Sequence, residues 1–241
     1  MKLLISITDE EEARAALAGG ADIIDVKNPR EGSLGANFPH VIRRVRQIVP
    51  PSQAVSATIG DVPNLPGTVA LAGLGAAVAG ADYVKVGLFG VAMADDALYL
   101  LRQVNRAVKD WNPQAQVIAA GYADAHKVGA LALLLVPEVA VEAGVDGCLL
   151  DTACIGEGNL FSLLIISQLE SFVQRCHAHG LLCALAGSLG EAEIPLARDL
   201  GADIVGIRSA ACRGDRVKGR IDSQKVRRLK RVILGAAGPC P

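Results

Sequence analysis

Short apolar runs alternate with amphipathic segments along the whole chain. Eight of these runs have the length and the Val, Ile and Ala content of strands: Lys2–Ile7, Ala21–Lys27, Ala54–Ile59, Ala81–Gly87, Gln116–Ala120, Val145–Asp151, Leu181–Ala186 and Ala202–Arg208. The segments between them include helix-like stretches: Glu10–Leu17, Phe38–Ile48, Asp95–Lys109, Leu160–His179 and Ser223–Leu234. Eight strands that are each followed by a helix are typical of a (β/α)8 barrel. An open, doubly wound sheet is the competing architecture.

A repeat favours the closed barrel over the open sheet. Four predicted strands begin alike, at Gly20-Ala21-Asp22, Gly80-Ala81-Asp82, Gly144-Val145-Asp146 and Gly201-Ala202-Asp203, and the glycines are 60, 64 and 57 positions apart. Two strand–helix units need that length, at ~30 residues each. The repeat therefore predicts strands two, four, six and eight of one barrel domain over residues 1–241. Each glycine is expected to end the preceding helix in a left-handed conformation.

Alternation within these strands predicts which side chains point into the barrel. The residues four and six positions after each repeat glycine are all apolar, so this face is expected to pack on the helices. The residues five and seven positions after it carry the charges: Asp25 and Lys27, Lys85 and Gly87, Leu149 and Asp151, Gly206 and Arg208. These late positions converge at the carboxyl-terminal mouth of the barrel, where such folds hold their active sites.

Lys27 and Lys85 are the candidate reactive groups. Burial and a second nearby ammonium both lower the pKa of a lysine, and a neutral amine can attack a carbonyl to form a Schiff base. Asp25 lies on the same face as Lys27 and is expected to orient its amine or carry its proton. Asp151 is the candidate for a second acid–base group. The alternative is structural, with each lysine simply paired to one of these carboxylates.

The loops after strands seven and eight suggest a phosphate site. Strand seven runs into Ala186-Gly187-Ser188-Leu189-Gly190, and strand eight into Arg208-Ser209-Ala210. Glycine lets backbone N–H groups approach a phosphate closely, serine adds a hydroxyl donor, and arginine can bind two oxygens at once. The candidate phosphate ligands are Gly187, Ser188, Arg208 and Ser209. An ordinary turn is the alternative interpretation.

Two further loops at the mouth have more than one interpretation. The glycine-rich segment 28–37 after strand two could be a lid, a second phosphate cradle or an ordinary surface loop. The loop Arg213–Arg220 holds four cations and could attract an anion, although a solvated basic loop is the simpler interpretation. His126 and Lys127 follow strand five and are expected at the surface.

Composition excludes several function classes. The chain has 241 residues and a formal net charge of −1, with no basic and aromatic face, which argues against nucleic-acid binding. It enters a strand at once, without a signal-peptide pattern, and has no apolar run of membrane-spanning length, so we expect a cytoplasmic protein that does not bind membranes. The six cysteines form no CxxC pair and are expected to be buried or incidental thiols. A homo-oligomer is compatible with the sequence, which does not fix the number of subunits.

Five motifs occur in order over nearly the whole chain. They are Asp25-Val26-Lys27-Asn28-Pro29, Glu31-Gly32-Ser33-Leu34-Gly35-Ala36, Val84-Lys85-Val86-Gly87, Asp151-Thr152-Ala153 and Leu185-Ala186-Gly187-Ser188-Leu189. Together they resemble the (5-formylfuran-3-yl)methyl phosphate synthases, also called 4-(hydroxymethyl)-2-furancarboxaldehyde-phosphate synthases. The resemblance implies a barrel enzyme, a carbon–oxygen lyase, that condenses two molecules of glyceraldehyde 3-phosphate to a furan aldehyde phosphate with loss of phosphate and water.

The resemblance also implies roles for individual residues. Lys27 would be the Schiff-base lysine and Lys85 the proton donor and acceptor. Asp25 and Asp151 would assist proton transfer. The family implies no metal or organic cofactor and a small phosphorylated substrate. Its product feeds the furan part of methanofuran-type C1 carriers in methanogens and some methylotrophs.

One position departs from the family pattern. The motif after strand six implies a lysine where this chain has Ile155. We expect Lys127 or Arg213 to substitute for it, unless the activity is altered. Two other functions therefore stay open: a different class I aldolase or sugar-phosphate lyase, and a non-catalytic barrel that binds a phosphorylated metabolite.

Overall fold

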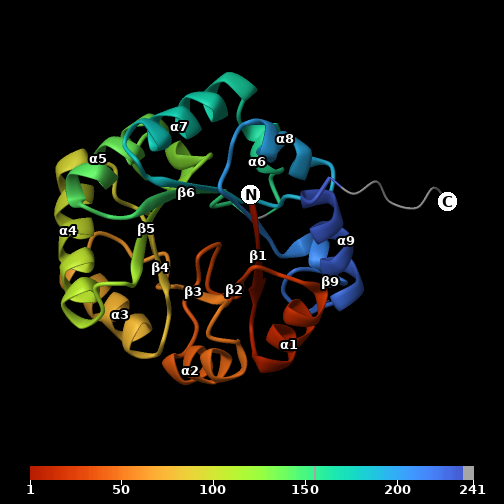
Figure 1. The fold of residues 1–241 in the computed structure, drawn as a ribbon. Coiled ribbons are helices and arrows are strands. Elements are labelled where there is room, and N and C mark those ends of the chain that lie inside the picture. The colour runs from red at the N-terminus through yellow and green to blue at the C-terminus, as the bar shows by residue number, and fades with distance from the viewer. Residues whose placement is uncertain (155, 236–241) are drawn as a thin grey trace.

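Eight parallel strands close into a barrel in the computed structural model, which describes residues 1–154 and 156–235 (Figure 1). The strands are β1 (Lys2–Ile7), β2 (Ile23–Val26), β3 (Ala54–Thr58), β4 (Tyr83–Gly87), β5 (Gln116–Tyr122), β6 (Gly147–Asp151), β7 (Leu182–Leu185) and β8 (Ile204–Ile207). Each strand pairs with the next, and β8 pairs with β1. The predicted (β/α)8 barrel is confirmed, and this closure excludes the open sheet.

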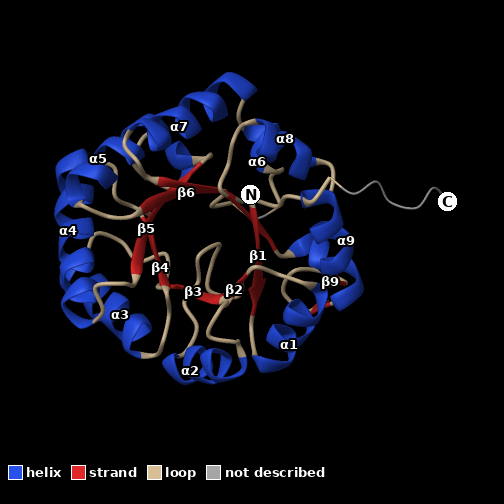
Figure 2. Cartoon of the chain, viewed as in Figure 1, coloured by secondary structure: helices blue, strands red, loops and turns tan. Residues whose placement is uncertain are grey.

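Helices surround the barrel on its outside (Figure 2). They are α1 (Glu10–Gly19), α2 (Pro39–Ile48), α3 (Pro66–Val78), α4 (Ala94–Trp111), α5 (Val136–Ala143), α6 (Leu160–Leu163), α7 (Ile166–Ala178), α8 (Glu193–Asp199) and α9 (Ser223–Ile233). Within the described residues the loops add 3-10 turns and a hairpin: η1 (Ala125–Lys127), η2 (Leu133–Leu135), η3 (Ser209–Ala211), β9 (Cys212–Arg213) and β10 (Arg220–Ile221). The predicted helical segment Leu160–His179 is interrupted, because the Gln168 side chain accepts the Ile165 N–H at 3.2 Å and starts a new helix there.

The four repeat segments connect neighbouring strands at the amino-terminal end of the barrel. The repeat glycines have φ angles of 90°, 103°, 73° and 87°, which confirms the left-handed conformation predicted for them. The aspartate that follows in each segment accepts a backbone N–H from the preceding strand: Asp22 from Leu3 at 2.7 Å, Asp82 from Val55 at 2.8 Å, Asp146 from Val117 at 2.7 Å and Asp203 from Cys183 at 2.8 Å. We call these four carboxylates the aspartate ties.

Each aspartate tie also contacts a basic side chain from a surrounding helix. The partners, in chain order of the ties, are Lys230, Arg46, Lys109 and His177. Because a charged acceptor strengthens a hydrogen bond to a backbone N–H, the ties stabilise the contact between neighbouring strands. The repeat found in the sequence is therefore a structural device at the end of the barrel opposite the predicted site.

The strands have one apolar layer on their outer face and another on their inner face. The outer layer packs strand residues such as Ile24 and Val26 against the helices, and the inner layer fills the lower barrel: Leu4, Ile23, Ile118, Leu149 and Ile204. The alternation predicted from the repeat is thereby confirmed. The inner layer forms an apolar floor, on which the charged residues of the mouth lie.

The cysteines take no part in a disulfide within the described residues. Cys148, Cys176, Cys183 and Cys212 are buried, and Cys154 is half-buried. Cys240 lies outside the described residues. Among those residues there is also no helix with the length and apolar character that crossing a bilayer would require.

Candidate active site

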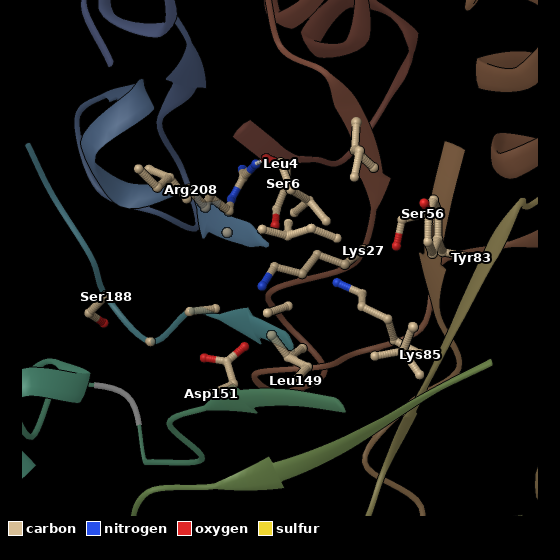
Figure 3. Close-up of a pocket in the computed structure, with 18 of the residues that line it drawn as sticks. Leu4, Ser6, Lys27, Ser56, Tyr83, Lys85, Leu149, Asp151, Ser188 and Arg208 are labelled. Atoms are coloured by element: carbon tan, nitrogen blue, oxygen red, sulfur yellow. Dashed lines mark hydrogen bonds between the residues drawn. The ribbon is translucent and has the colours of Figure 1, made fainter. Parts of the chain in front are cut away.

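A pocket lies at the carboxyl-terminal mouth of the barrel, above the apolar floor. Seven of the eight predicted site residues line it: Lys27, Lys85, Asp151, Gly187, Ser188, Arg208 and Ser209. Figure 3 shows the amines of Lys27 and Lys85 pointing into this space, with the Asp151 carboxylate directed toward Lys27. The eighth, Asp25, is fully buried beside it. The barrel therefore brings together residues that the sequence separates widely.

Lys27 immediately follows β2 and is 6% exposed. Its amine donates a hydrogen bond to the carbonyl oxygen of Ser33 at 3.2 Å. Burial lowers the pKa of Lys27 to about 8; Asp151 opposes this shift, and the nearby Lys85 ammonium adds to it. A substantial fraction of Lys27 is therefore an uncharged, nucleophilic amine at mildly alkaline pH.

Lys85 and Asp25 form a buried ion pair. The Lys85 amine lies 2.7 Å from Oδ1 of Asp25, and the Ser6 hydroxyl donates to Oδ2 at 2.8 Å. Burial raises the pKa of Asp25, but Lys85 and Lys27 outweigh burial and leave this pKa below its usual value. Asp25 was expected to orient Lys27 directly; instead it contacts Lys85, because it lies one inward-facing position deeper in the barrel.

Asp151 ends β6 and is almost fully buried. Its Oδ1 accepts the backbone N–H of Thr152 at 2.8 Å, which fixes the carboxylate at the mouth. The charge of Asp151 opposes the lowering of the Lys27 pKa, and both side chains line the same pocket.

The loop after β7 keeps its backbone accessible to the pocket. Gly187 has φ 99°, and Ser188, with φ 55°, is the non-glycine residue with positive φ in the described chain. A side chain at Gly187 would put its Cβ 2.7 Å from Cγ2 of Thr152, so only glycine fits. Ser188 and Ser209 are exposed at the pocket. Strained backbone of this kind is a frequent feature of ligand-binding loops.

Arg208 has protein partners that the sequence did not indicate. Its guanidinium donates to Glu12 of α1 at 2.9 Å, to the Ser6 carbonyl at 2.9 Å and to the Arg216 carbonyl at 2.6 Å. Glu12 is 1% exposed, and a carboxylate buried to this degree needs a counter-ion. Arg208 was expected to aim its donors at a phosphate, whereas the structure directs most of them at the protein.

The segment 28–37 lies beside the site, where its Ser33 carbonyl accepts the hydrogen bond of the Lys27 amine. Ser33 and Leu34 are buried, and Leu34 N–H donates to Oδ2 of Asp61 at 3.1 Å. Tyr122 donates to the other oxygen of Asp61, and burial raises the pKa of both Asp61 and Tyr122. This pair was not predicted from the sequence, where its one signal was the position of Asp61, two residues beyond a predicted strand.

Neither proposed substitute for the family lysine reaches the pocket. Lys127 pairs with Glu157, and Arg213 pairs with Asp222; both basic side chains are well exposed. Ile155 itself lies outside the described residues. Arg216 does line the pocket, so the loop Arg213–Arg220 is more than a solvated basic loop.

The closed barrel and the buried charges at its mouth define a (β/α)8-barrel enzyme. Residues 3–230 match the model of the 4-HFC-P synthase family, and the chain belongs to this family. The (5-formylfuran-3-yl)methyl phosphate synthase of Methanocaldococcus jannaschii is 54% identical over 231 residues, which cover 95% of this chain and 98% of that protein. The protein of the same name from Methanopyrus kandleri is 53% identical over 233 residues, with coverage of 96% and 98%. The resemblance seen in the sequence is confirmed.

Two solved structures share the fold of this chain but little of its sequence. The 3-hexulose-6-phosphate synthase of Salmonella typhimurium superposes with a TM-score of 0.70 at 19% identity and covers 98% of this chain and 100% of its own. Phosphoribosyl anthranilate isomerase from Thermus thermophilus gives a TM-score of 0.66 at 19% identity, with the same coverage. At this identity the likeness shows the fold alone.

Proposed function

We propose that this protein condenses two molecules of glyceraldehyde 3-phosphate to (5-formylfuran-3-yl)methyl phosphate. One phosphate and two waters leave, so the reaction is that of a carbon–oxygen lyase. Two observations support the proposal: membership of the 4-HFC-P synthase family, and a buried lysine with a pKa of about 8 at the barrel mouth. We place the reaction in the cytoplasm, in the synthesis of a methanofuran-type C1 carrier.

Lys27 is the proposed nucleophile. Its neutral amine attacks the aldehyde carbon of the first triose phosphate, and loss of water gives an iminium ion. The iminium withdraws electrons from the neighbouring carbon, whose C–H becomes acidic. Removal of this proton gives an enamine, and the enamine carbon can then attack the aldehyde of the second triose phosphate.

Lys85, Asp25 and Asp151 are the proposed proton-transfer groups. The Lys85 amine lies 2.7 Å from Asp25 and faces the pocket, which places it as the proposed donor to the departing or newly formed oxygens. Asp151 faces Lys27 and is placed to accept the proton from the carbon next to the iminium (Figure 3). Ring closure and the two dehydrations need such acids and bases on both sides of the bound intermediate.

The loops after β7 and β8 are the proposed phosphate contacts. Gly187 and Ser188 present backbone and hydroxyl donors from one side, and Ser209 does so from the other. Arg208 adds positive charge at the wall between them, although its pairing with Glu12 limits the donors that it can offer.

Product analysis tests this proposal directly. The enzyme is incubated with glyceraldehyde 3-phosphate alone, and mass spectrometry and ultraviolet absorption follow the products. We expect a furan aldehyde chromophore together with one inorganic phosphate released per product. A six-carbon aldol product that retains both phosphates, without the chromophore, would indicate a simple aldolase. Binding without turnover would indicate a non-catalytic barrel.

A further inference from the structure

Arg216 differs from the other cations that line the pocket. The others have protein acceptors: Lys27 with the Ser33 carbonyl, Lys85 with Asp25, and Arg208 with Glu12. Within the described part of the chain the Arg216 side chain makes no hydrogen bond or ion pair, and its Nε is buried without an acceptor. Because buried guanidinium donors normally have partners, an acceptor from outside the protein is the natural complement.

The loop that carries Arg216 is held in place by its own contacts. The Arg216 carbonyl accepts from Nε of Arg208 at 2.6 Å. Oδ1 of Asp215 accepts the N–H groups of Val217 and Lys218 at 2.7 and 2.8 Å. A Cβ at Gly219 would lie 2.3 Å from the Asp215 carbonyl, so the turn requires glycine. The hairpin of β9 and β10 closes the loop, which therefore presents Arg216 at the pocket in a defined position.

The charge balance of the pocket favours an anionic ligand. Asp25 and Glu12 offset Lys85 and Arg208, respectively. Once Lys27 has formed an iminium ion, the pocket holds two further positive charges, on Lys27 and Arg216. Asp151 is the one carboxylate among the described lining residues that remains to offset them. Burial lowers the pKa of Arg216; Asp151 opposes this shift and Arg208 adds to it. An anion bound beside Arg216 would offset both the cost of burying its charge and the repulsion between Arg216 and Arg208.

We infer that Arg216 binds the phosphate monoester of the substrate and so selects phosphorylated aldehydes over neutral ones, an inference that rests on the proposed function. A guanidinium group can donate two parallel hydrogen bonds to phosphate oxygens. Ser188 and Ser209 line the same pocket and supply neutral donors beside it. Arg208 then acts on this phosphate partly through Arg216, whose backbone it fixes.

The test compares two aldehydes that differ in the phosphate alone. Borohydride trapping at Lys27 is measured against the concentration of glyceraldehyde 3-phosphate and of glyceraldehyde, in the unaltered enzyme and in Arg216→Gln. We expect the half-saturating concentration of the phosphorylated aldehyde to rise about 10- to 100-fold in Arg216→Gln, as for a lost charged hydrogen bond. The half-saturating concentration of glyceraldehyde should not change. Lys218→Gln, which removes the same charge from an exposed position of the loop, is the matched control and should behave like the unaltered enzyme.

The outcomes separate this inference from the proposed function. An equal rise of the half-saturating concentration for both aldehydes, or no rise for either, would overturn the role of Arg216. Absence of Lys27 labelling in the unaltered enzyme would contradict the Schiff-base function instead. In that case calorimetry with inorganic phosphate still decides about Arg216: we expect binding at least tenfold weaker in Arg216→Gln, and equal affinity would overturn the inference.

Discussion

At the amino-terminal end of the barrel, each aspartate tie joins a strand N–H to a basic side chain from a helix, and all four ties repeat one arrangement. At the carboxyl-terminal mouth no arrangement repeats: Asp25 binds Lys85, Glu12 binds Arg208, and Arg216 has no partner among the described residues. The difference indicates that the repeated charged motif of this chain stabilises the fold. Buried charges without a repeated arrangement mark the working site.

The largest expected effect comes from breaking the Lys85–Asp25 pair at the mouth. In Lys85→Met the carboxylate of Asp25 stays buried without a counter-ion, and the proposed proton donor is lost. We expect turnover to fall by roughly 10²- to 10⁴-fold and the free energy of unfolding to fall by about 3–5 kcal/mol. Product formation and urea unfolding measure the two effects.

A double variant separates these two losses. In Lys85→Met combined with Asp25→Asn, the buried charge is removed together with its partner. Stability should then recover in large part, because no uncompensated charge remains, while turnover should stay low. Recovery of turnover in the double variant would show that Lys85 serves only to neutralise Asp25.

The pH dependence of amine reactivity at the mouth is the next largest effect. The pKa of Lys27 is lowered from 10.5 to about 8, so the reactive neutral amine is lost as pH falls through about 8. With glyceraldehyde, whose charge does not change, the trapping rate at Lys27 should rise about tenfold per pH unit below that point and level off above it. A midpoint near 10.5 would show that burial does not lower this pKa.

At the opposite end, Asp146→Asn should change stability without changing catalysis. Asp146 accepts from Val117 N–H at 2.7 Å and from Lys109 at 2.9 Å. Loss of the charged acceptor should lower the free energy of unfolding by about 2–3 kcal/mol, with kcat unaltered. Asp110→Asn removes an exposed partner of Arg106 and is the control, with an expected change below ~0.5 kcal/mol. A fall in kcat in Asp146→Asn would mean that the two ends are coupled.

The smallest expected effect concerns the hydrogen bond between Tyr122 and Asp61. Tyr122→Phe removes one donor from the half-buried carboxyl group of Asp61, which also accepts from Leu34 N–H. We expect a loss of about 1–2 kcal/mol in the free energy of unfolding, measured by urea denaturation, with labelling of Lys27 retained. Lost labelling would show that Tyr122 has to hold segment 28–37 in place for Lys27 to react.

The sequence predicts the barrel and its inward-facing residues well, for a physical reason. Side-chain alternation and left-handed glycines are local properties, so Gly20-Ala21-Asp22 and its three counterparts report strand starts and faces directly. Partner choice is not local. The pairing of Arg208 with Glu12 joins the end of β8 to α1, and neither residue indicates the other along the chain.

Arg216 is a second residue whose contacts could not be predicted from the sequence, in this case because it lies in a loop. Its four-cation segment resembles solvated surface, and only the turn between Asp215 and Gly219 brings one of these cations to the pocket. The sequence carries a signal for the turn, an aspartate and a glycine at its ends, but none for its direction. Contacts between distant segments decide that direction.

Reductive trapping tests the central claim, that Lys27 at the mouth is the reactive amine. The enzyme is treated with borohydride in the presence of glyceraldehyde 3-phosphate, and the labelled peptide is identified by mass spectrometry. We predict one modified residue, Lys27, with labelling abolished in a folded Lys27→Ala variant. Modification of Lys85 instead, or no modification in an enzyme that turns over its substrate, would contradict the account.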